Sequence, residues 1–165
     1  MTARIMQASS ILAVLLLMTP ANAQHGHQAA NGGTHTSPYK GQEAREIKSL
    51  SAEDIRQLRA GAGWGFAMPA ELSGYPGPRH VLDLADRLQL TGSQREKIEA
   101  IFRDMNAKAR RTGVGFIEAE RRLGQAFGDR SVTPDRLRSL VADAGRYREA
   151  LRVIHLDAHL ATRPL

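Results

Sequence analysis

The sequence predicts an all-α protein, and three observations support this prediction. Apolar residues recur at three- and four-residue steps through two long stretches, from Gln94 to Phe127 and from Pro134 to Ala158. Each stretch follows a residue that can cap a helix, and no stretch alternates apolar and polar residues as a strand would. We therefore expect a long antiparallel helical hairpin preceded by short helices. Such a hairpin leaves an apolar stripe uncovered, which predicts a homodimer.

The first element is a predicted signal peptide at residues 1–23. Arg4 supplies the positive charge, residues 11–18 form a short apolar run, and Ala21-Asn22-Ala23 matches a cleavage site. The run is shorter than the roughly 20 residues that span a membrane, which disfavours the alternative of an uncleaved anchor. We expect export to the periplasm with cleavage near Ala23.

Residues 24–50 are predicted to be a flexible leader that contains histidines. The stretch is polar at first and shows no apolar periodicity. His25, His27 and His35 lie in it, close to the new N-terminus. Imidazole nitrogens bind zinc, copper and nickel, so this leader is either a metal-buffering tail or a plain polar tail.

The helical domain is predicted to occupy residues 51–165 and to begin with short helices. Ser51-x-x-Asp54 starts the first of them, and glycines from Gly61 onward end it. Trp64, Phe66 and Met68 follow, either packing a loop onto the core or forming a binding patch, and we favour packing. Pro78 begins the next helix. Its predicted apolar face consists of Val81, Leu82, Leu84, Ala85 and Leu88.

The two long helices have clear predicted starts. Thr91 and Gln94 form a capping box at the start of the first, in which Gly113 and Gly115 make a bend plausible. Thr133 caps the second and Pro134 occupies its first position.

Composition and charge exclude several classes of function. The formal charge is +6, but the arginines alternate with acidic residues as on a solvated helix face, and no aromatic residues interleave with them. We therefore expect no nucleic-acid partner. The chain has no cysteine, which excludes thiol chemistry, and no motif lies in a context that predicts catalysis. We expect a protein that is not an enzyme.

A resemblance to a known family rests on residues 88–95. Leu90, Thr91 and Gln94 resemble the LTxxQ signature of the Spy/CpxP family of periplasmic stress chaperones and related heavy-metal resistance and sensor proteins. The order of export sequence, short helix, signature, long helix, turn and second long helix is also similar. A second copy of the signature, usual in relatives, would begin where this sequence ends.

The resemblance implies a non-catalytic function with two alternatives. Relatives pair into curved dimers that bind unfolded or stressed envelope proteins without ATP, or bind metal ions and report them to envelope signalling systems. The first alternative predicts a chaperone of the stress response that binds unfolded clients, divalent metal ions or both. The second predicts a heavy-metal sensor or regulator that docks on a membrane signalling partner.

A metal site is predicted near the C-terminus. His155 and His159 lie four residues apart, which places both imidazoles on one side of a helix and suits a divalent ion such as zinc, copper or nickel. The alternative is an ordinary pair at the edge of the core. Further ligands would come from a second subunit, His80, Glu118 or Glu120.

A client-binding surface is predicted where basic and apolar residues lie together on the long helices. Such a mixture allows weak and adaptable contacts, although the same residues also fit a solubilising exterior and a dimer core. The candidates are Arg103, Arg110, Arg111, Phe116, Arg146 and Tyr147.

Overall fold

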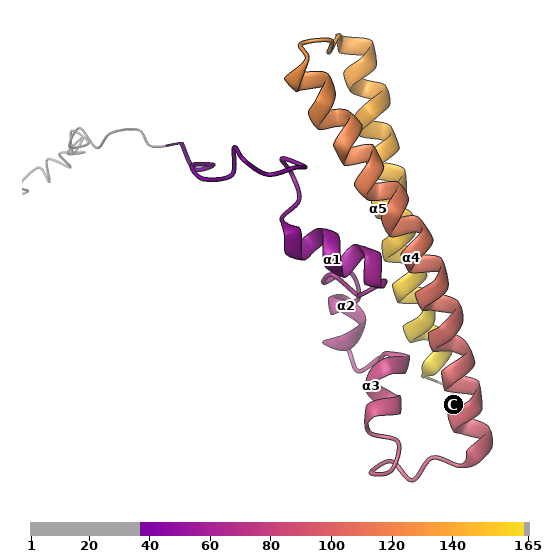
Figure 1. The fold of residues 1–165 in the computed structure, drawn as a ribbon. Helices are drawn as coiled ribbons and strands as arrows, with labels where there is room; N and C mark the ends of the chain where they lie inside the picture. Colours follow the sequence, from indigo (N-terminus) through magenta and orange to yellow (C-terminus); the bar gives the residue numbers. More distant parts are fainter. Residues whose placement is uncertain (1–36, 164–165) are drawn as a thin grey trace, which may run out of the picture. The chain divides into compact units, whose positions relative to one another are not determined.

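A computed structural model describes residues 37–163, and these form a helical unit (Figure 1). Its helices are α1 Ala52–Ala60, α2 Met68–Glu71, α3 Pro78–Asp83, α4 Gly92–Gly128 and α5 Pro134–Thr162. Within this range the only β-type pairing is an isolated bridge between Ile47 and Leu50. The all-α prediction is confirmed. The predicted signal peptide and His25, His27 and His35 lie outside the described residues.

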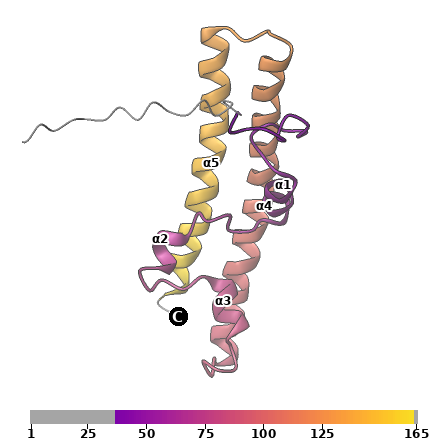
Figure 2. The ribbon, with the colours of Figure 1, turned by 90° about the vertical axis from the view of Figure 1, so that its left-hand side faces the viewer.

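The two long helices lie side by side and are joined by a short turn, as both views show (Figures 1 and 2). The predicted cap of α4 is present, since the Thr91 hydroxyl accepts a hydrogen bond from the Gln94 amide at 3.2 Å. The Gln94 side chain in turn accepts from the Thr91 amide at 3.0 Å. The start of α5 is also as predicted, with Thr133 accepting from the Arg136 amide. No helix among the described residues is long and apolar enough to cross a membrane.

The short helices pack on the long ones. Figure 2 shows α1 and α3 over α4, and α2 beside α5. The capping box of Ser51 and Asp54 starts α1, and Gly61 ends it with a left-handed backbone (φ 68°). This arrangement brings the loop between α1 and α2 against α5, where the candidate sites lie.

The core corrects the predicted boundary of the leader. Ile47 and Leu50 are almost fully buried and pack in one cluster with residues of α1, α4 and α5. Ser49 also donates a hydrogen bond to Glu120 on α4. Residues 37–50 therefore belong to the helical unit and not to a flexible leader, because two apolar side chains anchor the end of the stretch.

Gly113 and Gly115 of α4 mark close contacts, and the helix continues through both. An added Cβ on Gly113 would lie 2.4 Å from the Leu58 carbonyl oxygen of α1. On Gly115 it would lie 2.3 Å from the Tyr147 ring of α5. From the sequence we expect these two glycines to allow a bend in α4. The structure shows that they leave room for the close approach of α1 and α5.

The predicted apolar face of the Pro78 helix is only partly correct. Val81 and Ala85 are buried, but α3 ends at Asp83, and Leu84 and Leu88 are exposed. Turns follow the helix and lead to a left-handed residue at Gln89 (φ 51°), so helical periodicity no longer decides which side chains face the core. Phe127, assigned to the apolar face of α4, is 56% exposed near the turn, beyond the reach of the short helices.

Candidate functional site

Two hollows in the described residues bear on function, and the first contains the predicted histidine pair. We call it the histidine cavity. Its volume is about 370 Å³, and its lining includes His155 and His159 of α5, Glu71 of α2, and His80 of α3. Both α5 histidines are buried, with exposed fractions of 3% and 4%. The structure therefore brings both residues of the predicted pair to one cavity.

Hydrogen bonds to the backbone orient both imidazole rings. The His159 Nδ1 lies 2.7 Å from the Tyr75 carbonyl oxygen, and it must donate because a carbonyl only accepts. The His155 ring is hydrogen-bonded to the backbone of Ala62, and its buried Nε2 has no partner. Nε2 is therefore the remaining nitrogen of each ring, and carbonyl-held rings of this kind are common among metal ligands.

The electrostatics of the cavity favour a neutral His155. Burial, and secondly the nearby His159, lower the pKa of His155 below its ordinary value, against a smaller opposing effect of the Ala62 hydrogen bond. A neutral imidazole has the free lone pair that metal coordination needs. His159 Nε2 also lies 3.8 Å from a Glu71 carboxylate oxygen, which makes Glu71 the nearest acidic group to that ring.

The further ligands predicted from the sequence are only partly brought together. His80 lines the histidine cavity, but Glu118 and Glu120 do not. Both lie farther along α4 than the residues of that helix that line the cavity. Each has another partner: Glu118 pairs with Arg121, and Glu120 accepts a hydrogen bond from Ser49. Sequence reasoning missed Glu71, because nothing in its spacing connects it to α5. In residues 37–163, no three His, Asp or Glu side chains group closely enough to hold a metal ion.

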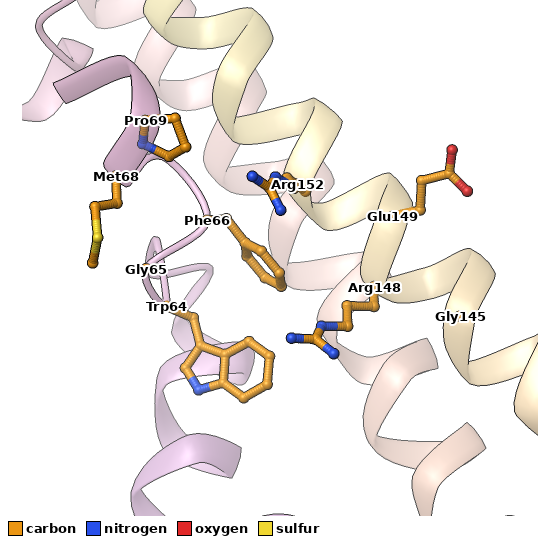
Figure 3. Close-up of a pocket in the computed structure, with 9 residues that line it drawn as sticks. All are labelled: Trp64, Gly65, Phe66, Met68, Pro69, Gly145, Arg148, Glu149 and Arg152. Carbon is orange, nitrogen blue, oxygen red and sulfur yellow. The ribbon is translucent and has the colours of Figure 1, made fainter. Parts of the chain in front are cut away.

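The second hollow lies between the loop after α1 and the exposed side of α5 (Figure 3), and we call it the arginine groove. It has a volume of about 680 Å³. One side, which we call the loop side, presents Trp64 and Phe66 of the loop with Met68 and Pro69 of α2. The α5 side presents Gly145, Arg148, Glu149 and Arg152. In Figure 3 both guanidinium groups point toward the aromatic rings, whereas the Glu149 carboxylate points away.

The loop side of the groove is held in a fixed shape. Trp64 donates its indole N–H to Asp54 at 2.8 Å, and its ring lies edge-on to Phe66 at a centroid distance of 5.3 Å. Its backbone is left-handed (φ 44°), which costs a residue with a Cβ roughly 1–2 kcal/mol. Phe66 is buried and stacks on His155, so one ring separates the groove from the histidine cavity. The predicted packing of Trp64 and Phe66 is confirmed, while Met68 is exposed.

The two arginines of the groove have no ion-pair partner among the described residues. Other arginines of α5 do, since Arg138 pairs with Asp135 and Arg146 pairs with Asp143. Arg148 and Arg152 lie four residues apart, where like charges face each other along a helix. This spacing was visible in the sequence, but only the structure places the pair opposite the aromatic loop.

The predicted client surface needs one correction. Phe116 is 3% exposed and packs against Trp64 inside the core, so it is not a surface residue. The helical pattern was right, but α1 and the following loop cover this position. Arg110, Arg111 and Tyr147 are exposed, while Arg103 pairs with Glu99 and Arg146 pairs with Asp143.

Comparisons with known proteins gave no match: no family model, no curated protein and no solved structure matches the chain.

Proposed function

We propose that this protein is a periplasmic, non-catalytic stress protein that binds unfolded segments of envelope proteins. The observation that supports the proposal most directly is the arginine groove, an open hollow with aromatic and apolar side chains on one side and unpaired arginines on the other. Apolar side chains of an unfolded chain would contact the loop side. The long arginines of α5 would adapt to polar groups of different clients.

Export and dimerisation are parts of this proposal. The predicted signal peptide supports export, and mass spectrometry of the secreted protein would give its first residue, expected at Gln24. Exposed apolar side chains on the two long helices support the pairing of two copies of the chain. These side chains include Val114, Phe127, Val141, Val153 and Leu160. Sedimentation analysis would then give twice the mass of the chain, and a monomer at all concentrations would contradict this part.

An aggregation assay with a groove-filling variant tests client binding. Gly145 lines the groove, and an added Cβ there meets nothing within 4 Å, so Gly145→Phe should fill the groove without disturbing the fold. Gly128→Phe is the matched control, because Gly128 also has open space but lies at the far end of α4. Residues 24–165 should slow aggregation of a reduced model protein at near-equal stoichiometry without ATP or metal.

Gly145→Phe is expected to lose this protection, and Gly128→Phe is expected to keep it. Circular dichroism confirms that both variants are folded. No protection by the unmodified protein would reject the proposed function, and equal protection by both variants would reject the groove as its site.

A second candidate function is metal sensing, with the protein docking on a membrane signalling partner. One observation favours it: His155 Nε2 is buried in a cavity shared with His159 and has no partner. The residues fit a divalent zinc, copper or nickel ion in kind, because His155, His159 and Glu71 offer two imidazoles and a carboxylate. The three side chains do not form a closed ligand set, so metal binding would require them to move together.

Calorimetric titration with zinc, copper and nickel tests this second function. Binding that His155→Ala and His159→Ala both abolish would support a site in the histidine cavity. Binding that persists in both variants but disappears when residues 24–36 are removed would place the metal on His25, His27 and His35. No binding in any form of the protein would reject metal sensing.

A further inference from the structure

We propose that the arginine groove selects clients by charge. Its preferred ligand is an extended peptide segment with two carboxylates two residues apart and an apolar side chain between them. This inference rests on the proposed function, since it names the class of segment that the groove would bind. It differs from general client binding because it predicts a sequence preference.

The spacing of the two arginines supports the carboxylate pattern. Arg148 and Arg152 lie four residues apart on α5, so their Cα atoms are separated by about 6 Å along the helix axis. In an extended peptide, residues i and i+2 point to the same side and are separated by about 6.6 Å. Two acidic residues in this arrangement would meet one guanidinium each when the peptide lies along α5.

The charges around the groove support an acidic ligand. The Glu149 carboxylate points away from the two guanidinium groups (Figure 3). Asp54 is not among the residues that line the groove, and it already accepts hydrogen bonds from the Trp64 indole and from Ser51. Neither Arg148 nor Arg152 forms an ion pair with a described acidic residue. A bound ligand with carboxylates would supply the missing negative charge and would relieve the repulsion between the two guanidinium groups.

The loop side of the groove supports the apolar part of the pattern. Trp64, Phe66, Met68 and Pro69 form a largely apolar wall opposite the arginines. In an extended segment, the residue between the two carboxylates points to the side opposite both of them, and therefore toward this wall. A leucine or phenylalanine there would contact the wall, which gives the pattern acidic-apolar-acidic.

Fluorescence of Trp64, the only tryptophan of the chain, provides the measurement. Ten-residue peptides without tryptophan are titrated against residues 24–165. One peptide contains Glu-Leu-Glu, a second replaces both glutamates with glutamine, and a third places the glutamates next to each other. The first is expected to bind about tenfold more tightly than the other two, as two charge-assisted hydrogen bonds to exposed arginines allow. Equal affinity of the first and second peptides would overturn the proposal.

Charge variants of the protein complete the test. Arg148→Gln combined with Arg152→Gln should remove the preference for the first peptide, whereas the two lysine replacements should retain part of it. Arg87→Gln is the control, because Arg87 is exposed and forms no ion pair with another described residue, but lies outside the groove. A preference that survives the double glutamine replacement, or that Arg87→Gln removes equally, would overturn the proposal. If all peptides bind alike while aggregation is still suppressed, the selectivity fails and the proposed function stands.

Discussion

Replacing Gly113 with alanine should destabilise the protein, although alanine is the better helix former. The new Cβ would lie 2.4 Å from the Leu58 carbonyl oxygen and 3.0 Å from the carbonyl carbon. The distance to the oxygen is about 1 Å shorter than an ordinary van der Waals contact. Backbone atoms cannot rotate away, so α1 must move as a unit. Overpacking of this kind costs about 1–3 kcal/mol, and the gain in helix propensity offsets about 1 kcal/mol of it. We expect a net loss of up to about 2 kcal/mol in the free energy of unfolding.

Gly124→Ala on the same helix is the matched control. A Cβ at Gly124 meets nothing within 4 Å, so only the gain in helix propensity should appear, which is up to about 1 kcal/mol. Urea unfolding followed by far-ultraviolet circular dichroism gives both free energies. The two variants should therefore shift the midpoint in opposite directions. If Gly113→Ala stabilises the protein as much as Gly124→Ala does, the close packing of α1 on α4 is refuted.

Three further variants test the cavity, the Trp64 loop and the start of α4. Because burial lowers the pKa of His155, the unfolded chain takes up a proton before the folded one does, so stability should fall as pH decreases through about 6.5. In buffer with a chelator, His155→Leu should reduce this fall in the urea midpoint, and an unchanged pH profile would contradict the assignment. The hydrogen bond from the Ser51 hydroxyl, followed by that from Trp64, lowers the pKa of Asp54, so its contribution should be lost as pH falls below about 4. The stability of the Asp54→Asn variant should therefore fall less at acidic pH than that of the unmodified protein. The variant should also shift the Trp64 emission, and an unchanged emission would contradict the contact between Asp54 and the indole. Thr91→Ala should lower the free energy of unfolding by about 1 kcal/mol through the lost cap, and undiminished aggregation suppression would show that Thr91 has a structural role only.

The sequence predicted the helix starts well because capping is a local property. Ser51, Thr91 and Thr133 each make the hydrogen bond that their sequence context predicts. The end of α3 was less predictable, because leucines continue in helical register after Asp83 while the backbone turns away. Local patterns therefore fix where a helix begins more reliably than where it stops.

The candidate sites were only partly predictable for a different reason. The spacing of His155 and His159 predicted that they share one side of α5, and both line the histidine cavity. Glu71 and the loop opposite Arg148 come from segments more than 70 residues away in sequence, and no local pattern connects them to α5. Phe116 illustrates the same point, since its helical pattern gives no sign that α1 and the Trp64 loop cover it.

The contact between Gly113 and Leu58 also determines where α1 can sit along α4. The Leu58 backbone lies against α4 at a position where no side chain intervenes. Sliding α1 by about one turn in either direction would place it against Ala109 or Phe116, each of which has a side chain in that space. One glycine thus sets the register between the two helices. Because the Trp64 loop begins directly after α1, the same glycine also sets where that loop begins along α4.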